Sequence, residues 1–94
     1  MCDNNASRMT YIDVRTTMDM DLMEQIKNND PKFIEPTILK ISIKPDVDCE
    51  IEINGHSTVK VRADLGLSIS YEDIKITSLV AKTAGVQFYA VISY

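Results

Sequence analysis

The chain has 94 residues, of which 45% are hydrophobic, and a formal net charge of -4 at neutral pH. A chain of this length forms one domain that hides roughly 65% of its unfolded surface, which leaves no room for a second domain. The acidic balance and the lack of a basic patch argue against nucleic acid as a partner.

The sequence contains no apolar run approaching the roughly 18 residues of a membrane span. Its start, MCDNNASR, has neither the basic beginning nor the apolar core of a signal peptide. We therefore expect a protein that is made in the cytoplasm, is not secreted by a signal peptide and does not bind a membrane. Cys2 lies in a polar tail and Cys49 on a strand, without metal-ligand spacing, so we expect no structural disulfide, metal or other cofactor.

Residues 1–9 are polar and lack periodicity, which predicts a flexible N-terminal arm before a single β-rich domain over 10–94. The segment 10–17, TYIDVRTT, is typical of a short strand. Asp19 or Asp21 then caps a short helix that ends near 28–29, before Pro31.

Pro31 and Pro36 flank a connector in which Phe33 and Ile34 are expected to plug one end of the core. The next segment, 37–44 (TILKISIK), alternates apolar and polar side chains with a period of two. This alternation predicts a strand with Leu39, Ile41 and Ile43 facing inward.

The clearest pattern spans 47–63, where apolar and charged residues alternate on both sides of Asn54-Gly55. It predicts a hairpin of two half-buried strands. A two-residue loop would set Cys49 beside Lys60 and mix the apolar with the polar face, so the loop must have an odd length.

We predict the loop 53–55, with Gly55 in the left-handed position of a G1 bulge. The loop 54–56 gives a similar pairing, with Glu50 against Lys60, but sets Gly55 at a less suitable place. The predicted pairs are Cys49 with Val59, Val47 with Val61, Asp48 with Lys60, and Asp46 with Arg62.

The segment 64–71 contains a glycine and mixed polarity, and we interpret it as a crossing loop. Strands over 74–82 and 86–94 then flank the turn Thr83-Ala84-Gly85, which predicts a second hairpin. Both faces of this hairpin are apolar: Leu79, Tyr89 and Val91 lie on one, and Val80, Phe88, Ile76 and Ile92 on the other. Either the helix over 19–29 or a neighbouring subunit must cover the face of Leu79, Tyr89 and Val91.

The residues that could act in catalysis or bind a cation are better explained by structural roles. His56, the one histidine, lies at a hairpin tip without a second titratable partner. An acidic set, spaced by two along one strand, is expected to form a charge ladder with Lys60 and Arg62 in preference to a cation site. This set comprises Asp46, Asp48, Glu50 and Glu52. The sequence has no nucleophile motif or phosphate-binding loop, so we expect no enzyme.

Three stretches, CEIEING, SYEDIKITSLV and GVQFYAVISY, together resemble the small β-sandwich structural proteins of tailed bacteriophages. The resemblance covers residues 37–94. It implies a multi-copy virion component, such as a head decoration or auxiliary capsid protein, a head-fibre or neck piece, or a tail subunit. It implies no catalytic residues.

The sequence therefore predicts a mainly β fold, a small antiparallel β-sandwich of about six strands with one short N-terminal helix. We expect a structural assembly protein of a virion that binds itself, as a homo-oligomer, or a larger capsid or tail protein. The alternative is a monomeric binding module. Such a module is either a small phage-encoded inhibitor that presents the acidic set or a carbohydrate-binding domain that uses the tyrosines.

Overall fold

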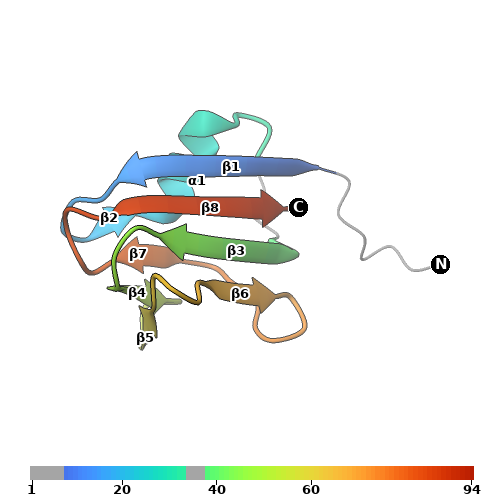
Figure 1. Ribbon diagram of the computed structural model, residues 1–94. Coiled ribbons are helices and arrows are strands. Elements are labelled where there is room, and N and C mark those ends of the chain that lie inside the picture. The colour runs from blue at the N-terminus through green and yellow to red at the C-terminus, as the bar shows by residue number, and fades with distance from the viewer. Residues whose placement is uncertain (1–7, 34–37) are drawn as a thin grey trace.

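The computed structural model describes residues 8–33 and 38–94. Within them, eight strands form two antiparallel sheets, and one short helix lies near the N-terminus (Figure 1). The elements are β1 (Met9–Arg15), β2 (Met20–Asp21), α1 (Leu22–Asn29), β3 (Lys40–Pro45), β4 (Cys49–Ile53), β5 (Ser57–Val61), β6 (Leu67–Ser70), β7 (Leu79–Ala81) and β8 (Gln87–Ser93). The predicted mainly β, sandwich-like fold with one helix is confirmed, with eight strands in place of about six.

Each sheet has four strands. The β8 sheet has the order β1-β8-β3-β6, and the β4 sheet has the order β2-β7-β4-β5. Figure 1 shows β8 between β1 and β3, with β7 of the β4 sheet behind them. The first and last strands of the chain are therefore neighbours, and Met9 pairs with Ser93.

The core lies between the two sheets and is built from the apolar side of each alternating strand. Ile12, Ile41 and Phe88 come from the β8 sheet, whereas Ile51 and Leu79 come from the β4 sheet, and all are at most 2% exposed. Burying one such side chain contributes about 1.5–3 kcal/mol. The period of two that predicted the strands thus also determines which side of each sheet is left to solvent.

The helix α1 closes one open side of the sandwich. Asp21 is its N-cap and accepts a hydrogen bond from the Glu24 backbone N–H at 3.2 Å, as predicted for one of the two candidate caps. Leu22 and Ile26 are fully buried, and the helix packs against β1 and β7. Phe33 is buried as predicted, whereas Ile34 lies outside the described residues.

The first hairpin forms, but its loop is shifted by one residue from the prediction. Cys49 pairs with Val61 and Glu50 with Lys60, so the loop is 54–56. Asn54 and Gly55 both have positive φ, 58° and 77°, because asparagine tolerates the left-handed conformation that we had assigned to glycine alone. Val47, predicted to be inward, is 50% exposed because it precedes β4.

The second predicted hairpin does not exist. β7 pairs with β4 and β2, whereas β8 pairs with β1 and β3 in the opposite sheet. The chain crosses between the sheets over 82–86, where Thr16 holds it: the Thr16 Oγ1 donates to the Thr83 carbonyl at 2.7 Å and accepts from the Val86 N–H at 3.0 Å. Crossing lets β7 turn Leu79 and β8 turn Phe88 to the same core, whereas the predicted hairpin would set these two residues on opposite faces of one sheet.

Two further boundaries differ from the prediction. The segment 64–71 is not only a loop, because Leu67–Ser70 forms β6 and pairs with β3. β1 begins at Met9, and Arg8 exchanges two backbone hydrogen bonds of 2.9 Å with Tyr94, so the predicted arm of residues 1–9 overlaps the sheet at its end. The rest of that arm, residues 1–7, lies outside the described residues.

Candidate functional site

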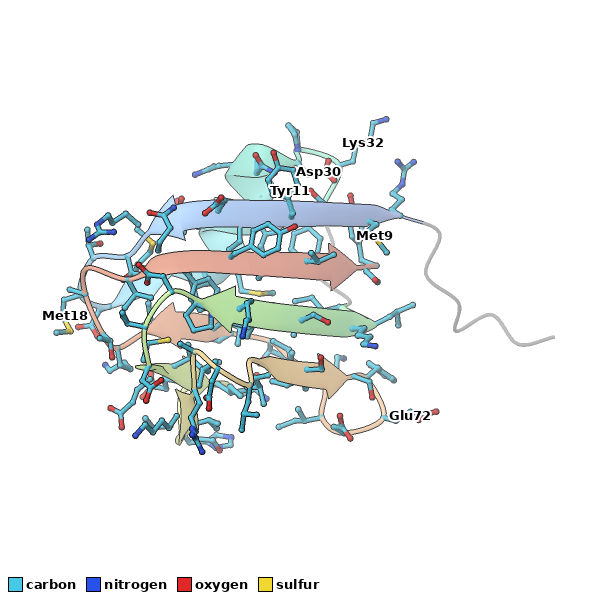
Figure 2. All side chains as sticks on the ribbon, in the orientation of Figure 1. Met9, Tyr11, Met18, Asp30, Lys32 and Glu72 are labelled. Atoms are coloured by element: carbon cyan, nitrogen blue, oxygen red, sulfur yellow. The ribbon has the colours of Figure 1, made fainter. Side chains whose placement is uncertain are left out.

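The outer side of the β8 sheet carries exposed aromatic and aliphatic side chains. Tyr11 is 53% exposed, Tyr89 is 41% exposed and Met9 is 71% exposed, and Val91 beside them is partly buried. We call this surface, centred on Tyr11, Tyr89 and Val91, the tyrosine face. Figure 2 is viewed from this side and labels Met9 and Tyr11 on β1.

Strand pairing brings the residues of this face together. Tyr11 lies opposite Val91, and Asp13 lies opposite Tyr89, in the β1–β8 register. The rings of Tyr11 and Tyr89 are therefore diagonal neighbours, with centroids 6.1 Å apart and planes inclined by 39°. This separation lies within the range of favourable aromatic pairs.

Charged and polar side chains surround the tyrosines. The Gln87 Nε2 donates to the Asp13 carboxylate at 2.8 Å, and Lys44 donates to the carbonyl of Ala63. Asp13, Arg15, Lys40 and Lys44 form no ion pair with any other residue that the structure describes. An apolar centre with a charged rim is the usual composition of a protein contact surface.

The predicted interface of Leu79, Tyr89 and Val91 is partly wrong. Leu79 is fully buried between the sheets and belongs to the core, because β7 lies in the β4 sheet. Tyr89 and Val91 share the tyrosine face. Tyr11 and Met9 were not predicted to lie at this interface. The alternation of 10–17 sets Tyr11 on the outer side of its strand, but no local signal shows that this strand pairs with the end of the chain.

The predicted helical cover is not present at this surface. α1 packs against β1 and β7 and buries Leu22 and Ile26 in the core. The tyrosine face is on the opposite side of the β8 sheet, so no element within 8–33 and 38–94 lies over Tyr89.

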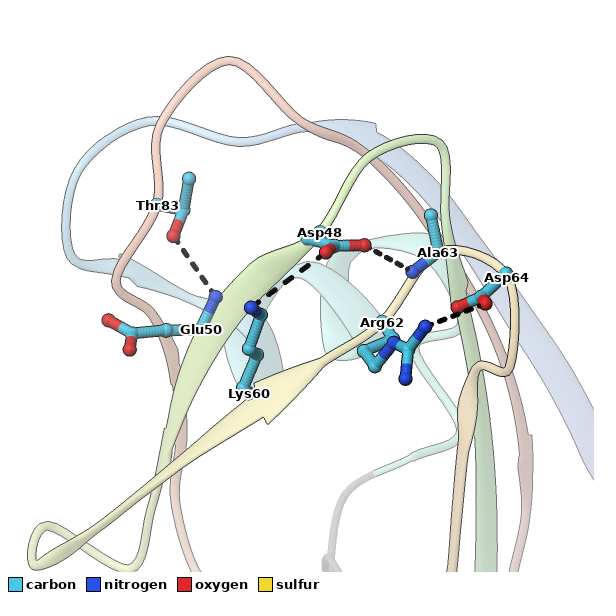
Figure 3. A network of polar contacts seen from close by, with 7 residues as sticks. All are labelled: Asp48, Glu50, Lys60, Arg62, Ala63, Asp64 and Thr83. Carbon is cyan, nitrogen blue, oxygen red and sulfur yellow. Dashed lines mark hydrogen bonds and ion pairs between the residues drawn. The ribbon is translucent and has the colours of Figure 1, made fainter.

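The acidic set does not form one surface. Asp46 and Asp48 precede β4, and their carboxylates accept backbone hydrogen bonds, from the Gln87 N–H at 3.0 Å and the Ala63 N–H at 2.8 Å. Asp48 also lies 3.9 Å from Lys60 (Figure 3). These two carboxylates therefore hold turns in place.

Glu50 and Glu52 lie on the outer side of the β4 sheet, among cations. Glu50 pairs with Lys60 in the β4–β5 register, as expected for the alternative loop 54–56, and its backbone N–H donates to the Thr83 Oγ1 at 3.0 Å (Figure 3). Arg62, predicted to face Asp46, instead pairs with Asp64 at 2.9 Å. The outer side of the β4 sheet is therefore a mixed-charge surface and does not present a concentrated negative field.

His56 and Cys49, the other two residues with candidate chemistry in the described part of the chain, lie in different surroundings. His56 is exposed at the hairpin tip, with its Nδ1 3.0 Å from the Ser57 hydroxyl. Burial raises the pKa of the Cys49 thiol, and the neighbouring Asp48 adds to this effect, which keeps the thiol protonated and unreactive. Among residues 8–33 and 38–94, no three potential ligands gather as a metal site. In this same part of the chain, no helix combines the length and the apolar character required to cross a membrane.

One shallow pocket of about 380 Å³ lies between β1 and α1. Its lining comprises Tyr11, Ile12, Asp13, Val14, Gln25, Asn28 and Asn29. The Asn29 side chain donates to the Tyr11 carbonyl, which lies on the free edge of β1. The lining contains one carboxylate and no second acid or base, so it offers no pair for proton transfer.

A partly buried contact joins the end of the chain to the helix. The Tyr94 hydroxyl donates to the Asp30 carboxylate, and the Tyr94 ring packs edge-on against Phe33 with centroids 5.0 Å apart. This hydrogen bond lowers the pKa of Asp30 and raises the pKa of Tyr94. We interpret the contact as a clamp between β8 and the end of α1.

Comparisons of the chain with models of protein families, with curated proteins and with solved structures found no match.

Proposed function

We propose that this protein is a structural assembly protein, which works by packing the tyrosine face against another protein. The observation that carries the proposal is the pair Tyr11 and Tyr89, exposed side by side on the neighbouring strands β1 and β8. Tyrosine is enriched in protein interfaces because its ring contributes a large apolar contact while its hydroxyl retains a polar partner. The setting implied by the resemblance is a multi-copy virion component of a tailed bacteriophage.

The proposal differs from the initial prediction in the surface that it uses. The initial prediction placed the interface on a two-sided apolar hairpin, which the strand pairing rules out. The present proposal uses the outer side of β1 and β8, where Tyr89 and Val91 are joined by Tyr11 and Met9. Hiding this surface contributes about 25 cal/mol per Å² of apolar area.

Tyr89→Glu is the test of the proposal. The side chain of Tyr89 points away from the core, so a charge there should leave the fold intact and oppose burial of the face. We expect the unchanged protein to associate with increasing concentration in sedimentation equilibrium, and Tyr89→Glu to remain monomeric.

Thr58→Glu is the matched control. Thr58 is exposed on β5 of the β4 sheet, so a carboxylate there adds the same charge far from the tyrosine face. This variant should associate like the unchanged protein. The proposal is wrong if the unchanged protein is a monomer at concentrations up to about 1 mM, where even contacts of about 4 kcal/mol are half formed.

The tyrosine pair also favours a second function, carbohydrate binding. Two neighbouring rings beside the hydrogen-bonded Asp13 and Gln87 provide stacking surfaces and polar groups, both of which sugars use. Tyr89→Leu separates the two functions, because leucine preserves apolar contact but not a flat ring. A variant that associates normally supports assembly, whereas loss of binding to a panel of glycans supports the second function.

A further inference from the structure

The charges around the tyrosine face are arranged with opposite signs on the two sides of β8. Asp13 of β1 and Lys44 of β3 both lie opposite Tyr89, one from each side. One step along the strands, Arg15 lies opposite Gln87, and Asp46 exchanges hydrogen bonds with the same Gln87 from the other side. These two rows across β8 therefore each carry a negative charge at one end and a positive charge at the other, whereas the row of Ser93 has Lys40 at one end and Met9 at the other.

We infer that the partner of the tyrosine face is a second copy of this chain, related by a twofold axis that runs parallel to β8 across the face. This inference rests on the proposed function and names the partner and the geometry of the same surface. Rotation about such an axis exchanges left and right but retains the position along the strands. β1 of one copy therefore lies over β3 of the other, and β8 lies over β8.

The rotation brings opposite charges together. Asp13 of each copy meets Lys44 of the other, and Arg15 of each copy meets Asp46 of the other, so the contact contains four pairs of opposite charge. Tyr89 and Val91 lie on the axis and pack against the same residues of the second copy. Two sheets that pack face to face in this way, about 10 Å apart, form the usual aligned β-sandwich contact.

The other twofold axis within the plane of the face, perpendicular to the strands, gives a poorer match. When it passes through the middle of the face, at the row of Ala90, it places β1 over β1 with the strand direction reversed, so Asp13 lies over Tyr11 and Arg15 lies over Met9. Both charges would lose water without gaining a partner, which is unfavourable. Shifted by two residues toward Gln87, the same axis sets Asp13 over Arg15, but it places Tyr11 and Val91 beyond the ends of the facing strands. Only the axis parallel to β8 combines contact of the tyrosine face with the charge pairs.

The size of the face indicates a weak dimer. Four strands about 4.8 Å apart and about 3.4 Å per residue over the seven residues of β8 give a flat area of roughly 450 Å² per copy. Twice this area falls below the roughly 1,200 Å² that stable contacts bury. We therefore expect association in the micromolar to millimolar range, with a strong dependence on salt, because exposed charge pairs are screened.

The test is a charge exchange between two variants of the full chain, Asp13→Lys and Lys44→Glu. Alone, each variant sets like charges against each other in both Asp13–Lys44 contacts, so each should associate more weakly than the unchanged protein, by about tenfold or more. Mixed in equal amounts, they form a heterodimer in which position 13 and position 44 again carry opposite charges at both contacts. Sedimentation equilibrium of the mixture should recover the dimer.

Three results distinguish the choice of the twofold axis from the use of the tyrosine face as an interface. Recovery in the mixture supports the axis parallel to β8. No recovery, while the unchanged protein still dimerises and Tyr89→Glu does not, overturns this axis but not the use of the face. A monomeric unchanged protein overturns the proposed function itself.

Lys44 also donates to the Ala63 carbonyl, so Lys44→Glu could fail to fold for a reason unrelated to association. A second measurement therefore tests the charge pairs without this variant. Association of the unchanged protein should weaken as salt is raised, and Asp13→Asn should reduce this salt dependence. Dimerisation that is independent of salt overturns the charge pairing.

Discussion

At the scale of single residues, Asn54 organises the tip of the first hairpin. Its Oδ1 accepts from the Thr77 N–H at 2.7 Å, the Thr77 hydroxyl at 3.0 Å and the Ser78 N–H at 3.2 Å, and its Nδ2 donates to the Lys75 carbonyl at 2.9 Å. The segment 74–78, before β7, is not paired as a strand, and the Asn54 side chain supplies hydrogen-bond partners for its backbone. The same bonds explain why Asn54 adopts a positive φ and the loop is shifted to 54–56.

Asn54→Ala should therefore destabilise the protein by about 3 kcal/mol. Roughly 2 kcal/mol come from backbone groups left without partners, and about 1 kcal/mol arises because alanine lacks the local side-chain hydrogen bonds that let asparagine tolerate the left-handed region. Asn54→Gly, the control, loses the same hydrogen bonds without the strain and should cost about 1 kcal/mol less. Unfolding in urea measures both values, and equal stability of Asn54→Ala and the unchanged protein would contradict the assigned role.

Also at this scale, the clamp between Tyr94 and Asp30 predicts a dependence of stability on pH. The hydrogen bond from Tyr94 lowers the pKa of Asp30 below its ordinary value of 3.8, so the native state holds this proton less tightly than the unfolded chain does. The stabilisation is therefore complete above pH 3.8 and is lost as the pH falls through the lowered value. The pKa of Tyr94 is raised above 10.0, so its contribution is complete below that pH and is lost as the pH rises through the raised value.

Tyr94→Phe isolates this contact, because the ring that packs on Phe33 is retained while the hydroxyl is removed. We expect the difference in unfolding free energy between the unchanged protein and this variant to be largest near neutral pH. It should shrink as the pH falls below 3.8 and Asp30 becomes protonated. A difference that stays constant across this range would show that the hydrogen bond is not the cause.

At the scale of elements, the alternation of side chains predicted most strands, but it did not predict which sheet each strand joins. The first hairpin could be predicted because its two strands are adjacent in sequence and a short loop limits their register. β7 and β8 are just as close in sequence, yet they separate into two sheets. The apolar residues on both sides of the predicted second hairpin indicated a conflict, and the structure resolves it by a crossing.

Thr16 is the residue on which this crossing depends. It is 4% exposed, and its hydroxyl both donates to Thr83 and accepts from the buried N–H of Val86. Thr16→Val has nearly the same shape but leaves that N–H without a partner, so it should cost about 1–3 kcal/mol in thermal or urea unfolding. Thr16→Ser retains the hydroxyl and should cost less. If Thr16→Ser is the less stable of the two variants, packing of the methyl group matters more than the hydrogen bonds.

At the scale of the whole molecule, the pairing of β1 with β8 creates the tyrosine face. Tyr11 and Tyr89 are far apart in sequence, and no turn between them limits their register, so the face was not predictable from local pattern. The sequence did indicate that Tyr89 and Val91 lie on one side of a strand, because that inference needs only the period of two. Leu79 was assigned to the wrong surface because its position depends on which sheet β7 joins, and the period of two does not determine this.

The most direct test of the central claim is a comparison of amide chemical shifts in dilute and concentrated solutions of the full chain. If the tyrosine face is the interface, the residues whose signals move with concentration should cluster on the outer side of the β8 sheet, around Tyr11, Tyr89 and Val91. Lys60 and Lys82, on the β4 sheet and at its end, should show no change. Signals that do not depend on concentration, or that move mainly on the β4 sheet, would contradict the account.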